Sequence, residues 1–171
     1  MKTIITIGLA ASVALTAAAQ QPPRPATDVT SAEIAAFIDK LPKDAISDLP
    51  IKVVDVGGYR VGVYGVFRPK AVKQDAVLHE VSTTEVYQMV EGAGTLVTGG
   101  RLIDERRDPK STTVRGSRID GGVSRRVVKG DVIIIPGRTP HWWSALETDI
   151  KYTIIRSDPD NRLPLRPGDS R

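Results

Sequence analysis

Short runs of β-forming residues separated by turn residues dominate this chain and limit the folds open to it. Gly57-Gly58, between the first two runs, is typical of a hairpin turn. Short strands joined by Gly, Pro and Asp predict an all-β sandwich or small barrel rather than an α/β sheet. We find eight such runs, at 51–56, 59–67, 76–81, 85–91, 94–98, 123–128, 131–136 and 150–156.

Length and composition add further limits. The chain has 171 residues, which suits one domain with a real core and is too short for two ordinary ones. It contains no cysteine, which excludes disulfides, cysteine-ligated zinc fingers, iron–sulfur clusters and cysteine nucleophiles. Only two histidines are present, so any metal site or chemistry based on imidazole must use His79 and His141.

The first nineteen residues have the pattern of a secretory signal peptide. Lys2 supplies a positive charge, residues 4–15 form an uncharged apolar run, and residues 17–19 are small alanines suited to cleavage. The apolar run is short for a membrane span, which needs roughly 20 residues. We therefore expect an exported protein, periplasmic or secreted, with no membrane span after cleavage; an N-terminal anchor helix is the alternative.

The segment after the predicted cleavage site divides into an arm and a helix, which together make up residues 20–50. The arm is rich in proline. Thr30 and Glu33 then have the spacing of a capping box, and Pro42 stops the helix. Four apolar residues at helical spacing give the helix one apolar face: Ile34, Phe37, Ile38 and Leu41. The barrel is expected over 51–157, followed by a surface tail at 158–171.

Basic residues are concentrated between the strand runs at 94–98 and 131–136. Residues 101–129 contain nine Lys or Arg and four Asp or Glu, a net charge of +5. No nucleic-acid-binding module is recognisable, so we expect no nucleic-acid partner. The interpretation we favour is a solvated loop of mixed charge.

Two stretches resemble the two sequence motifs of the cupin superfamily, in its small single-domain form. The first runs from His79 through Glu85 to Gly92, with the E-x6-G spacing of the first cupin motif. The second runs from Gly130 through Pro136 to His141 and follows the second motif. The sequence departs from the pattern at Val81 and Ala145, where the family has a histidine and an asparagine. The resemblance implies a double-stranded β-helix, or jelly-roll barrel, and a homodimer.

Three residues of these motifs are candidate metal ligands. His79 and Glu85 stand on neighbouring strand runs, and a barrel of this kind would bring His141 near both. Two imidazoles and one carboxylate with open positions suit iron(II), and also manganese, nickel or zinc. The sequence does not choose between these metals.

Five further residues are candidates for a substrate pocket. Tyr87 and Met89 alternate with Glu85 on one strand, Trp142 and Trp143 follow His141, and Arg138 in the turn could meet an anionic substrate. Core packing explains the aromatic residues and Met89 equally well.

Three classes of function follow from these residues. The first is a metal-dependent enzyme acting on a small organic molecule by dioxygenase-, isomerase- or lyase-type chemistry. The second is a metal-free protein that binds a small molecule in the same barrel. The third is a structural protein with a filled interior.

Overall fold

The computed structural model describes residues 25–165, so the predicted signal peptide at 1–19 lies outside the described residues. The described chain contains one helix, α1 (Ser31–Asp39), followed by strands throughout. The strands are β1 (Ser47–Asp55), β2 (Arg60–Arg68), β3 (Ala76–His79), β4 (Thr84–Glu91), β5 (Ala93–Thr98), β6 (Arg101–Ile103), β7 (Arg106–Arg107), β8 (Thr113–Gly116), β9 (Arg118–Asp120), β10 (Val123–Val128), β11 (Val132–Ile135), β12 (His141–Leu146) and β13 (Ile150–Asp158).

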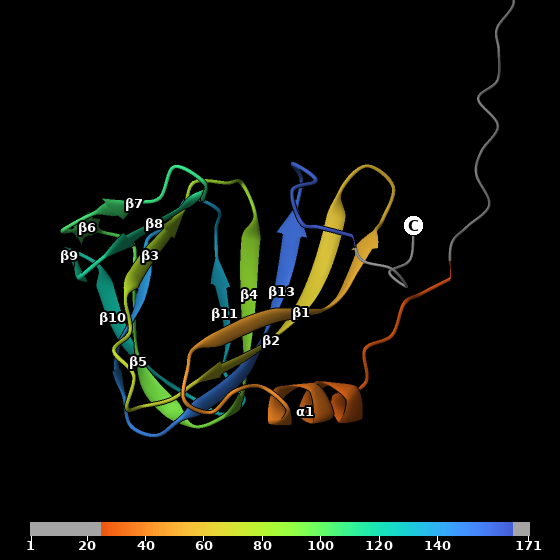
Figure 1. Cartoon of the computed structure of the whole chain (residues 1–171), viewed down its shortest axis with the longest axis horizontal. Coiled ribbons are helices and arrows are strands. Elements are labelled where there is room, and N and C mark those ends of the chain that lie inside the picture. The colour runs from red at the N-terminus through yellow and green to blue at the C-terminus, as the bar shows by residue number, and fades with distance from the viewer. Residues whose placement is uncertain (1–24, 166–171) are drawn as a thin grey trace, which may run out of the picture.

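Two antiparallel sheets face each other across the core (Figure 1). One has the strand order β1-β2-β13-β4-β11, and the other has the order β10-β5-β12-β3-β8-β7. The short strands β6 and β9 pair with each other. The chain passes from one sheet to the other between β2 and β3, β3 and β4, β4 and β5, β10 and β11, β11 and β12, and β12 and β13. This topology is the jelly-roll barrel that the motifs predict.

Alternation along the strands fills the space between the sheets. In β4, Tyr87 and Met89 are buried while Gln88 between them is exposed. In β11, Ile133 and Ile135 are buried while Ile134 is 67% exposed. Such alternation places one face of each strand in the core. Leu96, Trp143 and Tyr152 from the central strands belong to the same buried cluster.

Helix α1 packs on the outside of the barrel, against β2. Its capping box forms as predicted, with Thr30 Oγ1 accepting from the Glu33 amide at 3.2 Å and the Thr30 amide donating to the Glu33 carboxylate at 2.7 Å. Ile38 and Leu41 are buried with Phe67 of β2. The helix is therefore held by its apolar face. Within residues 25–165, no helix has the length and apolar character required to cross a membrane.

Two parts of the chain differ from the sequence-based expectation. The basic stretch at 101–129 is not a loop, because it forms β6 to β9 before β10, the strand predicted at 123–128; Leu102, Val114 and Ile119 are buried while most neighbouring cations are exposed. The strand β12 was also missed. It contains no β-branched residue, unlike the runs that were recognised as strands, and its pairing with β5 shifts register between Trp143 and Ala145.

We expect Gly65→Val to weaken the attachment of α1. A Cβ atom at Gly65 would lie 2.7 Å from Phe37 Cδ1 and 3.1 Å from Ile38 Cγ1, so the Phe37 ring or the helix that carries it must shift. Overpacking of this kind costs about 1–3 kcal/mol of unfolding free energy. Urea denaturation measures this loss of unfolding free energy. The double variant Phe37→Ala/Gly65→Val should recover part of the loss, and strictly additive losses would contradict the contact.

Candidate metal centre

Glu85 is a carboxylate buried between the two sheets. It lies near the start of β4 and is 3% exposed. Arg156 stands directly opposite on β13, and its Nε donates to Glu85 Oε1 at 2.7 Å. The Tyr87 hydroxyl donates to Oε2 at 3.2 Å. Because a buried charge is costly unless it is paired, Arg156 is what allows a carboxylate at this depth.

His79 approaches Glu85 from the opposite sheet. It is the last residue of β3, and its Nδ1 lies 2.8 Å from Thr113 Oγ1 on the paired strand β8. The other ring nitrogen, Nε2, lies 4.0 Å from Glu85 Oε1. The Thr113 contact therefore directs Nε2 toward the carboxylate.

His141 opens β12 and also points Nε2 at Glu85. Its Nδ1 lies 3.0 Å from the Thr139 carbonyl oxygen, and its Nε2 lies 3.4 Å from Glu85 Oε2. A carbonyl oxygen only accepts hydrogen bonds, so Nδ1 carries the proton. In the neutral ring, Nε2 then offers a lone pair to the site.

The turn before His141 is positioned by a close backbone contact. A Cβ atom at Gly137 would lie 2.6 Å from the carbonyl carbon of Ser82, in the connection between β3 and β4. Only glycine fits this approach without displacing backbone. The second motif therefore packs directly on the first. Together they bring one ligand atom each from His79, Glu85 and His141 to within 4.8 Å of one another.

Burial keeps both imidazole rings neutral, and the neighbouring Arg156 keeps Glu85 ionised. Burial lowers the pKa of His79 to about 4 and also lowers the pKa of His141. Burial alone would raise the pKa of Glu85, but Arg156 and the two histidines together lower it to about 2. Burial raises the pKa of Tyr87 well above its ordinary value, so its hydroxyl stays a donor.

These three residues fit a divalent transition metal. Neutral imidazoles and an ionised carboxylate are the protonation states that such a metal requires. A backbone carbonyl holds Nδ1 of one ring and a threonine hydroxyl contacts Nδ1 of the other, which is the usual support for metal-binding histidines. The motifs resembling those of cupins supply all three, on a double-stranded β-helix. This is a cupin fold.

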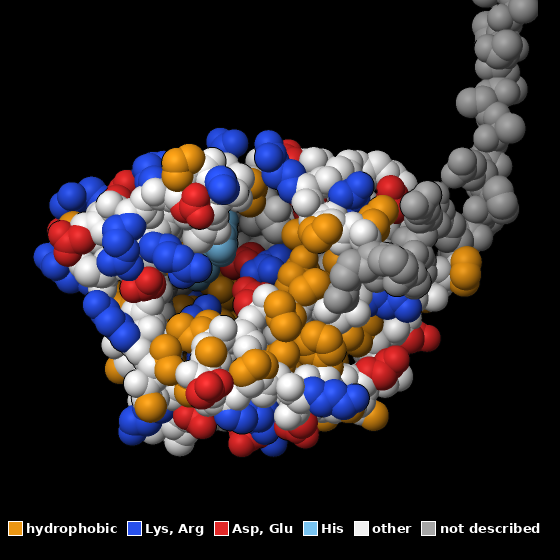
Figure 2. Space-filling view, in the orientation of Figure 1, with side chains coloured by type: hydrophobic (Ala, Val, Ile, Leu, Met, Phe, Trp, Pro, Cys, Tyr) orange, Lys and Arg blue, Asp and Glu red, His pale blue; other side chains and the backbone are white. Residues whose placement is uncertain are grey.

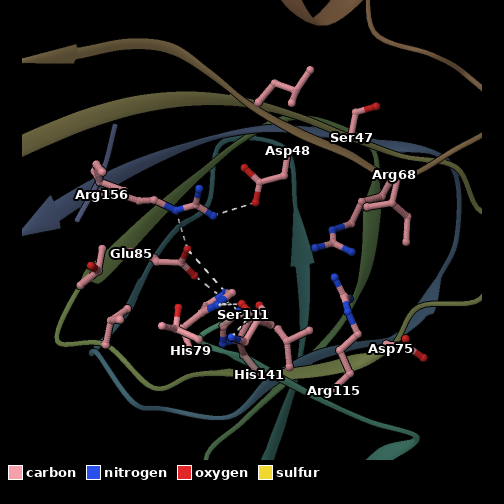
Figure 3. A pocket seen from close by; sticks show the side chains of 18 of the residues that line it. Ser47, Asp48, Arg68, Asp75, His79, Glu85, Ser111, Arg115, His141 and Arg156 are labelled. Atoms are coloured by element: carbon pink, nitrogen blue, oxygen red, sulfur yellow. Dashed lines mark hydrogen bonds and ion pairs between the residues drawn. The ribbon is translucent and has the colours of Figure 1, made fainter. Parts of the chain in front are cut away.

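The site lies in a cavity of about 900 Å³ between the sheets. The cavity opens to the surface, and a histidine is visible inside it (Figure 2). Figure 3 shows His79 and His141 on one wall and Glu85 with Arg156 on the other. Tyr87 also lines the cavity. The three candidate metal ligands therefore line the cavity itself.

The other predicted pocket residues lie elsewhere. Met89 and Trp143 are buried in the core cluster and do not line the cavity. Trp142 is half-buried, and its indole N–H donates to the Gln74 carbonyl oxygen at 2.9 Å. Arg138 is an exposed turn residue with a φ of 61°, also outside the cavity lining.

Eight charged residues that line the cavity were not among the predicted site residues, and three of them lie on β1, β2 and β13 of one sheet. Arg68 shares the inward face of β2 with Tyr64 and Val66, and Arg156 shares that of β13 with Ile154. An arginine at an inward position of an otherwise apolar strand face is the signal that was available. Asp48 of β1, which accepts from Arg156 Nη2 at 2.7 Å, had no comparable signal.

Comparison with known proteins gives similarity at the level of fold. No protein-family model matches the chain, and no curated protein sequence matches it. Among solved structures it is similar to a DMSP lyase from Ruegeria pomeroyi, with 14% identity over 84% of this chain and 79% of that chain, at a TM-score of 0.48. It is also similar to a protein from Bacillus halodurans, with 16% identity over 82% of this chain and 86% of that chain, at a TM-score of 0.48. A cupin 2 conserved barrel domain protein from Salinispora arenicola has 13% identity over 78% of this chain and 91% of that chain, at a TM-score of 0.45.

Substituting Gly137 should disturb the site through the backbone. In Gly137→Ala the new methyl group meets the Ser82 backbone, so the turn carrying His141 must move. We expect a loss of about 1–3 kcal/mol in unfolding free energy and weaker metal binding. Denaturation and metal titration measure the two effects. Unchanged values for both would show that the two motifs do not depend on this contact.

Acid should destabilise the metal-free protein. Histidine in the unfolded chain titrates near pH 6.5, whereas folded His79 titrates at about 4. Between these values the unfolded state binds more protons, so stability falls as the pH is lowered, by up to about 1.4 kcal/mol per pH unit for each histidine. Denaturation of the chelator-treated protein at several pH values gives the slope of the unfolding free energy against pH. His79→Asn should reduce the slope, and an identical slope would contradict the lowered pKa.

Proposed function

We propose that this protein holds one divalent transition metal through His79, Glu85 and His141 and acts on a small organic molecule in the barrel cavity. When bound, such a metal acts as a Lewis acid or binds oxygen, which suits dioxygenase-, isomerase- or lyase-type chemistry. Iron, manganese, nickel and zinc all accept this donor set.

The observation that carries the proposal is the close approach of His141 Nε2 to the Glu85 carboxylate. His141 Nε2 and Glu85 Oε2 lie 3.4 Å apart, and the proton of the neutral ring is on Nδ1, facing Thr139. Two lone pairs therefore face each other in a buried place. A cation between them removes this repulsion, and the nearby His79 Nε2 supplies a third donor.

The surrounding residues prepare the site for chemistry on a bound molecule. Arg156 and the Tyr87 hydroxyl fix both oxygens of Glu85, so the carboxylate has one orientation. The barrel wall shields His141 and Glu85 from solvent, while His79 remains partly exposed on the cavity side. A cavity of about 900 Å³ is large enough for a small organic substrate beside the three ligands. It also argues against a filled, purely structural interior.

Export and pairing of two copies belong to the same proposal. The sequence of residues 1–19 supports export, and the motif resemblance supports a homodimer. N-terminal sequencing of protein recovered from the cell envelope and light scattering of the purified protein test the two statements.

Metal analysis tests the proposed site. Protein purified without chelator or a His-tag column should carry about one equivalent of transition metal, and His79→Ala and His141→Ala should lose it while remaining folded. Elemental analysis and circular dichroism provide the measurements.

A matched pair of glutamates supplies the control. Glu85→Gln should lose metal, whereas Glu80→Gln should keep it, because Glu80 pairs with Arg107 at the surface and lies outside the ligand group. If the wild type took up none of the four metals, the site would be a metal-free pocket.

A further inference from the structure

The cavity beside the proposed metal site carries more positive than negative side chains. Six basic residues line it against three acidic ones, Asp48, Asp75 and Glu85. All three carboxylates are already paired: Arg156 binds Asp48 and Glu85, and Arg106 binds Asp75 at 2.9 Å. The remaining lining cations therefore have no carboxylate partner among residues 25–165: Arg68, Lys73, Lys110, Arg115 and Arg162.

Two of these cations face each other from opposite walls. Arg68 ends β2 in one sheet, and Arg115 lies in β8 of the other sheet. Figure 3 shows the two guanidinium groups pointing toward one another across the cavity. On β8, Arg115 shares its face with Thr113, the residue that contacts His79. Arg115 is therefore on the same wall as the proposed ligands His79 and His141, and Arg68 is on the wall of Glu85.

The contacts of Arg68 hold it in place without neutralising it. Its Nε donates to the Tyr152 hydroxyl at 2.7 Å and its Nη1 donates to Gln74 Oε1 at 2.9 Å. Both acceptors are uncharged, and Nη2 has no hydrogen-bond partner within the described residues. A guanidinium fixed by neutral groups, with donors left over, is well arranged to bind an oxyanion.

One side of the cavity mouth carries apolar side chains. Ile46 and Leu49 line it and are 37% and 49% exposed, and Leu163 lines the same side. Figure 2 shows hydrophobic side chains gathered on the β1 and β2 side of the hollow and Lys and Arg side chains on the β8 side. A ligand that matches both sides has an anionic group and an apolar body.

We propose that the substrate is a carboxylic acid with an apolar body, its carboxylate bound between Arg68 and Arg115. This rests on the proposed function for the reaction, but the binding of the carboxylate depends on the arginines. The planar carboxylate accepts two parallel hydrogen bonds from a guanidinium, and Ile46 and Leu49 contact the apolar part. The molecule then extends from the arginine pair toward His79, Glu85 and His141.

Calorimetric titration of the purified protein with benzoate tests the proposal. Benzoate should bind more tightly than the neutral amide benzamide, and more tightly than acetate, which lacks the ring. Arg115→Ala should weaken benzoate binding about tenfold or more. Arg115 is exposed, and its side chain has no hydrogen-bond or ion-pair partner among residues 25–165, so this variant should fold normally.

Two variants complete the design. Arg68→Lys keeps the charge but loses the planar fork, and should also weaken benzoate binding. Arg118→Ala removes the same charge from β9, outside the cavity lining, and should leave binding unchanged. Equal binding of benzoate and benzamide, or equal losses in Arg115→Ala and Arg118→Ala, would overturn the proposal. Tighter binding of inorganic phosphate than of benzoate would overturn the carboxylate assignment.

The same variants separate this inference from the proposed function. Arg115→Ala and Arg68→Lys should retain metal, because neither residue belongs to the ligand group. If the wild type bound no metal but still bound benzoate through the two arginines, the carboxylate site would stand without the metal. If metal bound normally and benzoate did not, the metal site would stand alone.

Discussion

A buried carboxylate and the arginine that neutralises it hold together most of one sheet of this barrel. Arg156 on β13 binds Glu85 on β4 and Asp48 on β1, and its guanidinium carbon lies 4.1 Å from the centroid of the Tyr64 ring on β2. Four of the five strands thus meet at one cation. Removing one partner of a buried pair typically costs about 3–5 kcal/mol. The opposite sheet supplies only neutral imidazoles to this centre, so the ionised carboxylate is the fixed point around which the site forms.

The division of the site between two sheets explains why both motifs are needed. Glu85 enters from one sheet and His79 and His141 from the other, so the ligands meet only when the sheets are packed. The close approach of Gly137 to Ser82 joins the second motif to the connection between β3 and β4. The same packing leaves the cavity open on one side, where the proposed substrate enters. Folding and site assembly are therefore one event in this protein.

Much of the fold followed from local pattern. Runs of β-forming residues bounded by turn residues predicted β2, β4 and β11, and the capping box predicted the start of α1. The pattern failed at β12, which contains no β-branched residue. It also failed in the basic stretch, where a few buried residues such as Val114 hold short strands in a charged segment.

The sequence by itself determined the all-β barrel and selected His79, Glu85 and His141, because two histidines and one glutamate stood at motif positions in a chain with no other imidazole. Only the tertiary structure decided what surrounds them. It paired Arg156 with Glu85 across neighbouring strands, placed Arg68 and Arg115 on facing walls, and left Arg138 outside the cavity. Spacing along a strand fixes which face a side chain takes, but contacts between strands distant in sequence depend on register and on the packing of the sheets.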